Sequence, residues 1–155
     1  MAATTPAAIY TALRKLIKGL DPDGSAHGGE SEFEYAAPGF SWDDVEVRAE
    51  SDIDRRFTVH GLARGAPQNF GSPAEYDYDG TIRVTIGHAI TDDEAEGETR
   101  RDADLFQIIE ELEKSGNFPS GVSLVRFVDQ TVSKYDDNHW VSVLVFELYF
   151  TIAAP

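Results

Sequence analysis

The sequence contains no cysteine among its 155 residues. This absence excludes disulfide bonds, thiolate zinc sites and cysteine nucleophiles, and it fits a protein that folds in a reducing cytoplasm. No segment approaches the ~20 consecutive apolar residues of a membrane-spanning helix, and residues 1–5 lack the basic start of a signal peptide. We therefore expect no association with a membrane.

Basic residues are also scarce. The chain has 13 Lys and Arg against 28 Asp and Glu, a formal net charge of -15. Proteins that bind nucleic acids need clustered Lys and Arg to hold the phosphate backbone, and no basic stripe is visible here. We expect no specific contact with DNA. The acidic surface fits a salt-adapted organism as well as it fits a functional electrostatic field.

Motifs of catalysis are missing as well. The sequence has no GxSxG, GxGxxG, P-loop or HExxH pattern, and its four histidines are scattered. His60 and His88 both end predicted strands, where they could approach one another and bind a metal. A small metal- or ligand-binding domain is thus one open alternative, although the sequence favours a protein that is not an enzyme and holds no cofactor.

What the sequence does contain is a strong C-terminal pattern. Two apolar segments, residues 122–135 and 140–152, are separated only by residues 136–139, which predicts a long β-hairpin with Tyr135 opposite Trp140. The second arm is apolar on both faces, and a sheet with one solvated face does not need both sets. One set comprises Trp140, Leu144, Phe146, Leu148, Phe150 and Ile152, and the other comprises Val141, Val143 and Val145. We expect the first set to form the core and the valines to contact a partner subunit.

Two amphipathic helices accompany several strands. The first helix is predicted to begin at Thr5-Pro6, and the second to begin with a capping-box pattern at Thr99 and to end at Gly116. Strands are predicted at residues 45–48, 55–61 and 81–88. The fold class is therefore α+β: one domain over residues 1–155, with a mostly antiparallel sheet covered on one face by the two helices.

The predicted connections are long and acidic, at about residues 19–44, 62–79 and 89–98. Ordinary connections run ~4 to 6 residues, so loops of this length are often functional. The middle loop is richer in aromatic residues than a plain linker. It contributes Arg64, Phe70, Tyr76 and Tyr78 as further candidates for a subunit interface.

The order of elements and three segments, residues 56–61, 118–122 and 140–150, resemble the tail terminator proteins of long-tailed bacteriophages, the lambda-type family and its relatives in gene transfer agents. The resemblance implies a virion protein of the tail and neck, assembled in the host cytoplasm. Six copies would form a ring that caps the tail tube and provides the head-tail joining surface. Its partners would be the tail tube protein and the head-tail connector protein, with genome DNA passing through the lumen. No catalytic residues accompany this resemblance.

Another ring component of the same particle, a head-tail connector or a tail tube subunit, is a second open alternative. A tube subunit polymerises into stacked rings, whereas a terminator stops at one.

Overall fold

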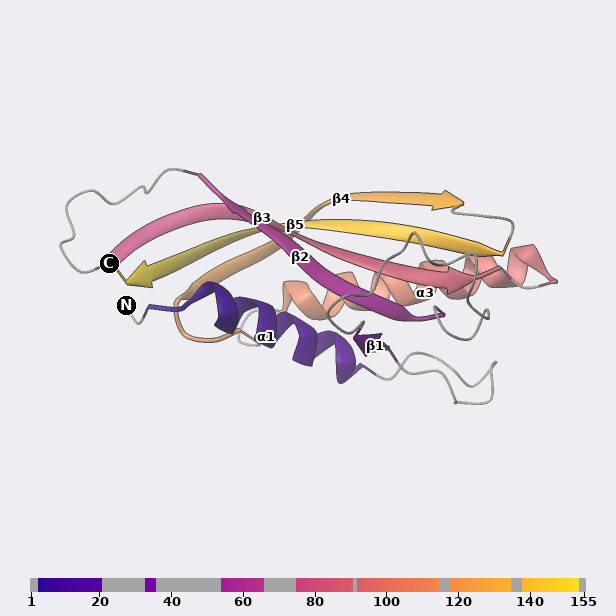
Figure 1. The fold of residues 1–155 in the computed structure, drawn as a ribbon, viewed down its shortest axis with the longest axis horizontal. Helices are drawn as coiled ribbons and strands as arrows, with labels where there is room; N and C mark the ends of the chain where they lie inside the picture. Colours follow the sequence, from indigo (N-terminus) through magenta and orange to yellow (C-terminus); the bar gives the residue numbers. More distant parts are fainter. Residues whose placement is uncertain are drawn as a thin grey trace.

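The computed structural model describes residues 3–20, 33–35, 54–65, 75–90, 92–114, 118–134 and 138–153. The elements are α1 (Pro6–Lys18), β1 (Glu34–Tyr35), β2 (Arg56–Arg64), β3 (Glu75–Ala89), α3 (Glu94–Glu113), β4 (Val122–Lys134) and β5 (His139–Ala153). The strands form one sheet in the order β1-β2-β3-β5-β4, antiparallel except for the β1–β2 pair. Both helices lie on one face of this curled sheet (Figure 1). The predicted α+β class is confirmed, while the predicted strand at residues 45–48 lies outside the described residues.

The sheet is built around two long central strands. β3 and β5 each have 15 residues and pair along their whole length, from Glu75 opposite Ala153 to Ala89 opposite His139. At ~3.3 Å per residue such a ribbon runs roughly 45 to 50 Å, about three times the usual strand. The long C-terminal hairpin of β4 and β5 is confirmed.

The predicted register of that hairpin is wrong by one residue near the turn. Lys134, and not Tyr135, faces Trp140, and two irregularities in β4 shift the pairing further so that Arg126 lies directly opposite Glu147. Each β-bulge adds an unpaired residue to one strand. The alternation of apolar residues shows which face is buried but does not reveal where such an extra residue is inserted.

Helix α1 begins where the sequence predicts. The Thr5 hydroxyl accepts a hydrogen bond from the Ala8 amide (3.1 Å), and Pro6 occupies the first helical position, where its missing N–H is not needed. Ile9, Leu13 and Ile17 form its buried stripe. α1 therefore packs through one face and exposes the other.

Helix α3 begins earlier than predicted. Asp93 is its N-cap and accepts a hydrogen bond from the Glu96 amide (3.1 Å), whereas Thr99 lies inside the helix and donates its hydroxyl to the Ala95 carbonyl (3.0 Å). Glu94 and Glu96 occupy the first turn, where the helix dipole favours acids. Half of the predicted loop 89–98 is thus helical. The predicted end at Gly116 lies outside the described residues, and the helix ends at Glu113.

The loop between β2 and β3 is likewise shorter than residues 62–79, because β2 continues to Arg64 and β3 begins at Glu75.

A single core joins the helices to the sheet. It comprises Ile9, Leu13 and Ile17 of α1, Leu105, Ile108 and Leu112 of α3, and Phe33, Phe57, Val59, Ile82, Val84, Ile86, Val125, Leu144, Phe146, Leu148 and Phe150. Burying one such side chain completely, instead of leaving it exposed to water, stabilises the folded state by ~1.5 to 3 kcal/mol. The predicted core face of β5 is therefore correct.

Candidate subunit interface

The face of the sheet opposite the helices carries the valine stripe, Val141, Val143 and Val145. The three side chains are half-buried, although neighbouring Leu144 and Phe146 are completely buried on the core side. By register, Val143 lies between Thr85 and Thr131. Both described helices pack on the other face, so no helix of the described residues covers the stripe. Nothing in the structure shows the predicted neighbour, and its presence stays a prediction.

Polar and charged residues border the valine stripe. Val145 lies between Arg83 of β3 and Asp129 of β4, and Arg126 forms an ion pair with Glu147. A surface with an apolar centre and a polar rim is the usual composition of a protein interface.

His60 also lies at this border and is neutral at physiological pH. Its Nε2 is 2.8 Å from the Thr85 hydroxyl. Burial, and secondly the charge of Arg83, lower the pKa of His60 below its ordinary value of 6.5. The stripe therefore carries no added positive charge at this point near pH 7.

The other predicted interface residues lie elsewhere. The Arg64 guanidinium sits 4.8 Å from the centre of the Tyr78 ring, which stacks on Phe150 (5.7 Å between centroids). Tyr78 packs against the core and so lies on the helix side of the sheet, far along β3 from the valines. Tyr76 belongs to β3, whose backbone register pairs it with Ile152, and Phe70 lies outside the described residues. The predicted set is therefore divided between two surfaces.

A cleft of about 320 Å³ adjoins Arg64. It is lined by Ala63, Arg64, Gly65, Asp79, Gly80, Thr81 and Glu147. The β2–β3 pairing shifts between His60 and Ala63, and Gly61 there has φ 71°. This bulge brings the Ala63 carbonyl so close to Gly80 that an added Cβ would lie 2.4 Å from its oxygen. Only glycine fits at Gly80.

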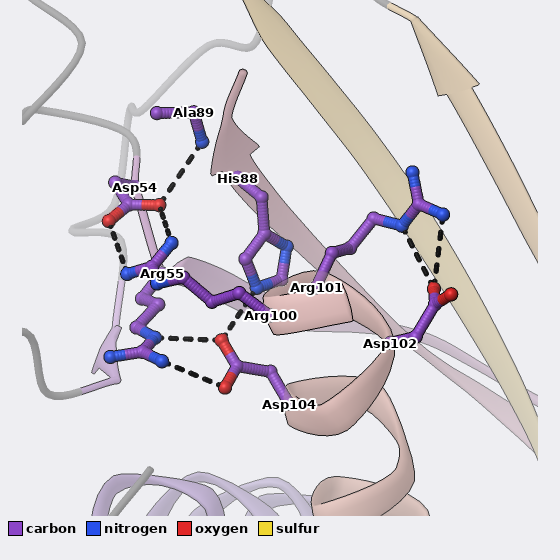
Figure 2. A network of polar contacts seen from close by, with 8 residues as sticks. All are labelled: Asp54, Arg55, His88, Ala89, Arg100, Arg101, Asp102 and Asp104. Atoms are coloured by element: carbon purple, nitrogen blue, oxygen red, sulfur yellow. Dashed lines mark hydrogen bonds and ion pairs between the residues drawn. The ribbon is translucent and has the colours of Figure 1, made fainter. Parts of the chain in front are cut away.

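A buried polar network occupies the opposite end of the sheet (Figure 2). Arg55, completely buried, donates to both carboxylate oxygens of Asp104 (2.7 and 2.9 Å), and the Nε2 of His88 is 2.8 Å from the same carboxylate. Arg100 donates to both oxygens of Asp54 (2.8 and 2.7 Å), which also accepts the Ala89 amide (3.1 Å). These contacts fasten α3 to the start of β2 and the end of β3.

The basic partners in this network lower the pKa of both of its carboxyl groups. Burial alone would raise the pKa of Asp104, but hydrogen bonds from His88 and Arg55 and their charges lower it below 3.8. Asp54 behaves in the same way, because its hydrogen bonds from Arg100 and the charge of Arg100 outweigh its burial and lower its pKa. His88 and Asp104 are 0% and 2% exposed, so no substrate reaches them. The network holds the fold together, and sequence reasoning missed it.

The histidine pair of the metal-binding alternative does not form. His60 lies opposite Arg83 on the valine side, whereas His88 points into the core beneath α3. His60 is paired with Arg83, and Arg83 and His88 are five residues apart along β3, a distance of ~16 Å. The prediction that His60 and His88 could approach one another is wrong. Arg83, the partner of His60, and His88 are at odd and even positions of β3, so the two histidines also lie on opposite faces of the sheet. Within the described ranges, no group of three or more potential metal ligands gathers.

None of the helices in the described part of the chain combines the length and hydrophobicity needed to span a membrane.

Comparison with protein-family models and with curated proteins finds no match. Comparison with solved structures finds a chain in one described as "Virion of native gene transfer agent (GTA) particle". The two folds agree with a TM-score of 0.60 over 97% of this chain and 99% of that one, at 13% sequence identity. At this identity the likeness establishes a common fold.

Proposed function

We propose that this chain is a structural virion protein of a phage-like particle, a tail terminator without catalytic activity. Six copies form a ring that caps the tail tube, ends its polymerisation and provides the surface to which the head is joined. The observation that carries the proposal is the end-to-end match with the gene transfer agent chain, 97% of one and 99% of the other.

The valine stripe supports assembly into a ring. A closed ring needs a heterologous contact that repeats between neighbours, and an open apolar strip with a polar rim supplies buried area for one. Val141, Val143 and Val145 lie in the most extensively paired strand of the sheet, β5, which is bonded on both sides. The strip is therefore held rigid before any partner arrives.

The negative charge supports a position around DNA. With a formal net charge of -15, a ring of this protein presents carboxylates far in excess of bases. A negative lumen repels phosphates, so a genome passes through without adhering. The partners in this proposal are the tail tube protein below the ring and the head-tail connector protein above it.

The proposal is tested by mixing the purified protein with uncapped tubes, assembled from the purified tail tube protein of a particle that carries it. We expect negative-stain images of tubes with a single ring at one end, which no longer elongate when free tube protein is added. Self-assembly into stacked rings would instead identify a tube subunit, and a failure to bind either tubes or heads would contradict a role in the tail.

A further inference from the structure

Helices α1 and α3 expose stripes of opposite charge. α1 contains no acid, and Thr11, Lys15 and Lys18 are exposed along one side of it. We call these three residues the α1 stripe. α3 exposes the α3 stripe, Glu98, Asp102, Phe106 and Glu110, at successive intervals of four residues. Side chains at this spacing lie on one side of a helix.

Phe106 is the unusual member of the α3 stripe. Its side chain is 67% exposed, and in the described part of the chain only Val128 (53%) is another large exposed hydrophobic. The core contacts of α3 are made by Leu105, Ile108 and Leu112, so the fold of the monomer does not require an aromatic ring at position 106. A phenylalanine flanked by acids suits a site whose partner has an apolar surface bordered by bases.

The chain itself carries a basic surface, the α1 stripe, in which Thr11 rather than a larger apolar residue lies beside Lys15 and Lys18. Two α3 stripes would repel each other, because each presents carboxylates on both sides of Phe106. The α1 stripe supplies the opposite charge in Lys15 and Lys18, beside the small side chain of Thr11, which leaves room for a ring to pack.

We propose that the α3 stripe of one copy docks on the α1 stripe of the next copy. This inference rests on the proposed ring and names one of its contacts. Two different surfaces of one chain that fit each other generate a head-to-tail, heterologous interface, which closes into a ring when its rotation allows. The helices cover one face of the sheet and the valines lie on the other, so the two contacts do not compete for one surface.

The spacing of the two stripes is compatible with such a contact. Four residues of helix correspond to ~6 Å, both from Thr11 to Lys15 and from Phe106 to either Asp102 or Glu110. With the Phe106 ring against Thr11, Lys15 meets a carboxylate whether the two helices run parallel or antiparallel.

Charge reversal tests the contact. Variant A carries Lys15→Glu and Lys18→Glu, and variant B carries Asp102→Lys and Glu110→Lys, the two acids that can meet Lys15. We expect each variant alone to be folded and monomeric by circular dichroism and light scattering, because its stripes repel. An equimolar mixture restores the ring, since alternating copies put opposite charges together at every contact. A control with Asp92→Lys and Glu96→Lys changes the charge as much as variant B but outside the stripe, and it assembles like the wild type.

Phe106→Ala tests the same contact without changing any charge. Because the side chain is exposed in the monomer, its removal leaves the melting temperature of the monomer unchanged and weakens assembly by about tenfold or more.

The outcomes separate this inference from the proposed function. If the wild type forms rings and variants A and B also do so alone, the α1–α3 contact is refuted while the ring stands. If A and B fail alone and their mixture also fails, the heterologous pairing is refuted. A wild type that stays monomeric at every salt concentration and at tube ends contradicts both.

Discussion

Asp104 accepts hydrogen bonds from Arg55 and from His88, with all three side chains buried. We expect Asp104→Asn to lower the free energy of unfolding by about 3 to 5 kcal/mol, because it leaves the Arg55 cation buried without its counterion. Urea denaturation at pH 7 measures the loss.

The matched control is Asp102→Asn in the same helix. Asp102 pairs with Arg101, but its side chain is 60% exposed, so we expect a loss below about 1 kcal/mol. Equal losses for the two variants would show that the network contributes no more than a surface ion pair.

Stability should also depend on pH, because folding shifts the pKa values of three residues. Folding lowers the pKa of Asp54 and of Asp104 below 3.8, so their contribution to stability is complete above that pH and is lost as the pH falls through their lower folded values. Folding also lowers the pKa of His60 below 6.5. Below pH 6.5 the unfolded state therefore binds this proton more readily, which reduces stability.

The free energy of unfolding from urea titrations between pH 8 and pH 3 should thus decline in two stages, first below about 6.5 and then below about 3.8. His60→Gln should remove most of the first stage. A wild-type profile that is level from pH 7 to pH 5 would be inconsistent with the shift at His60.

Strand β5 presents two apolar faces with different roles. Phe146 is completely buried and its ring meets Phe127 edge to face at 5.9 Å between centroids. We expect Phe146→Ala to cost about 3 to 5 kcal/mol, because it removes this contact and leaves a cavity. A loss below ~1 kcal/mol in urea denaturation would contradict the placement of Phe146 in the core.

Val143 on the opposite face gives the complementary prediction. Since its side chain is only half-buried, Val143→Asp should leave a folded protein with a native circular dichroism spectrum and should prevent assembly. A variant that unfolds outright would instead place Val143 in the monomer core.

Elements with a clear period could be predicted from the sequence. The hairpin, helix α1 and the two faces of β5 follow from alternation or helical spacing of apolar residues. The start of α3 could not, because Asp93 and Thr99 are both acceptable caps and tertiary contacts of Arg100 and Asp104 favour the longer helix. The bulges of β4 leave no pattern that is visible in sequence.

The buried network of Arg55, His88 and Asp104 could not be predicted from the sequence either. Arg55, His88 and Asp104 are distant in sequence, and each reads as an ordinary surface residue until the topology brings them together. The one available signal was the position of Asp104 beside Leu105, on the core side of a predicted amphipathic helix.

At the scale of the whole molecule, the central claim is that the chain closes into a single ring. The measurement that tests it most directly is the absolute mass in solution by light scattering across a salt series, with negative-stain images of each species. The account predicts a discrete particle of six times 17.1 kDa, about 103 kDa, seen as isolated rings. Stacked tubes of open-ended mass, or a monomer that forms no ring even on tube ends, would contradict it.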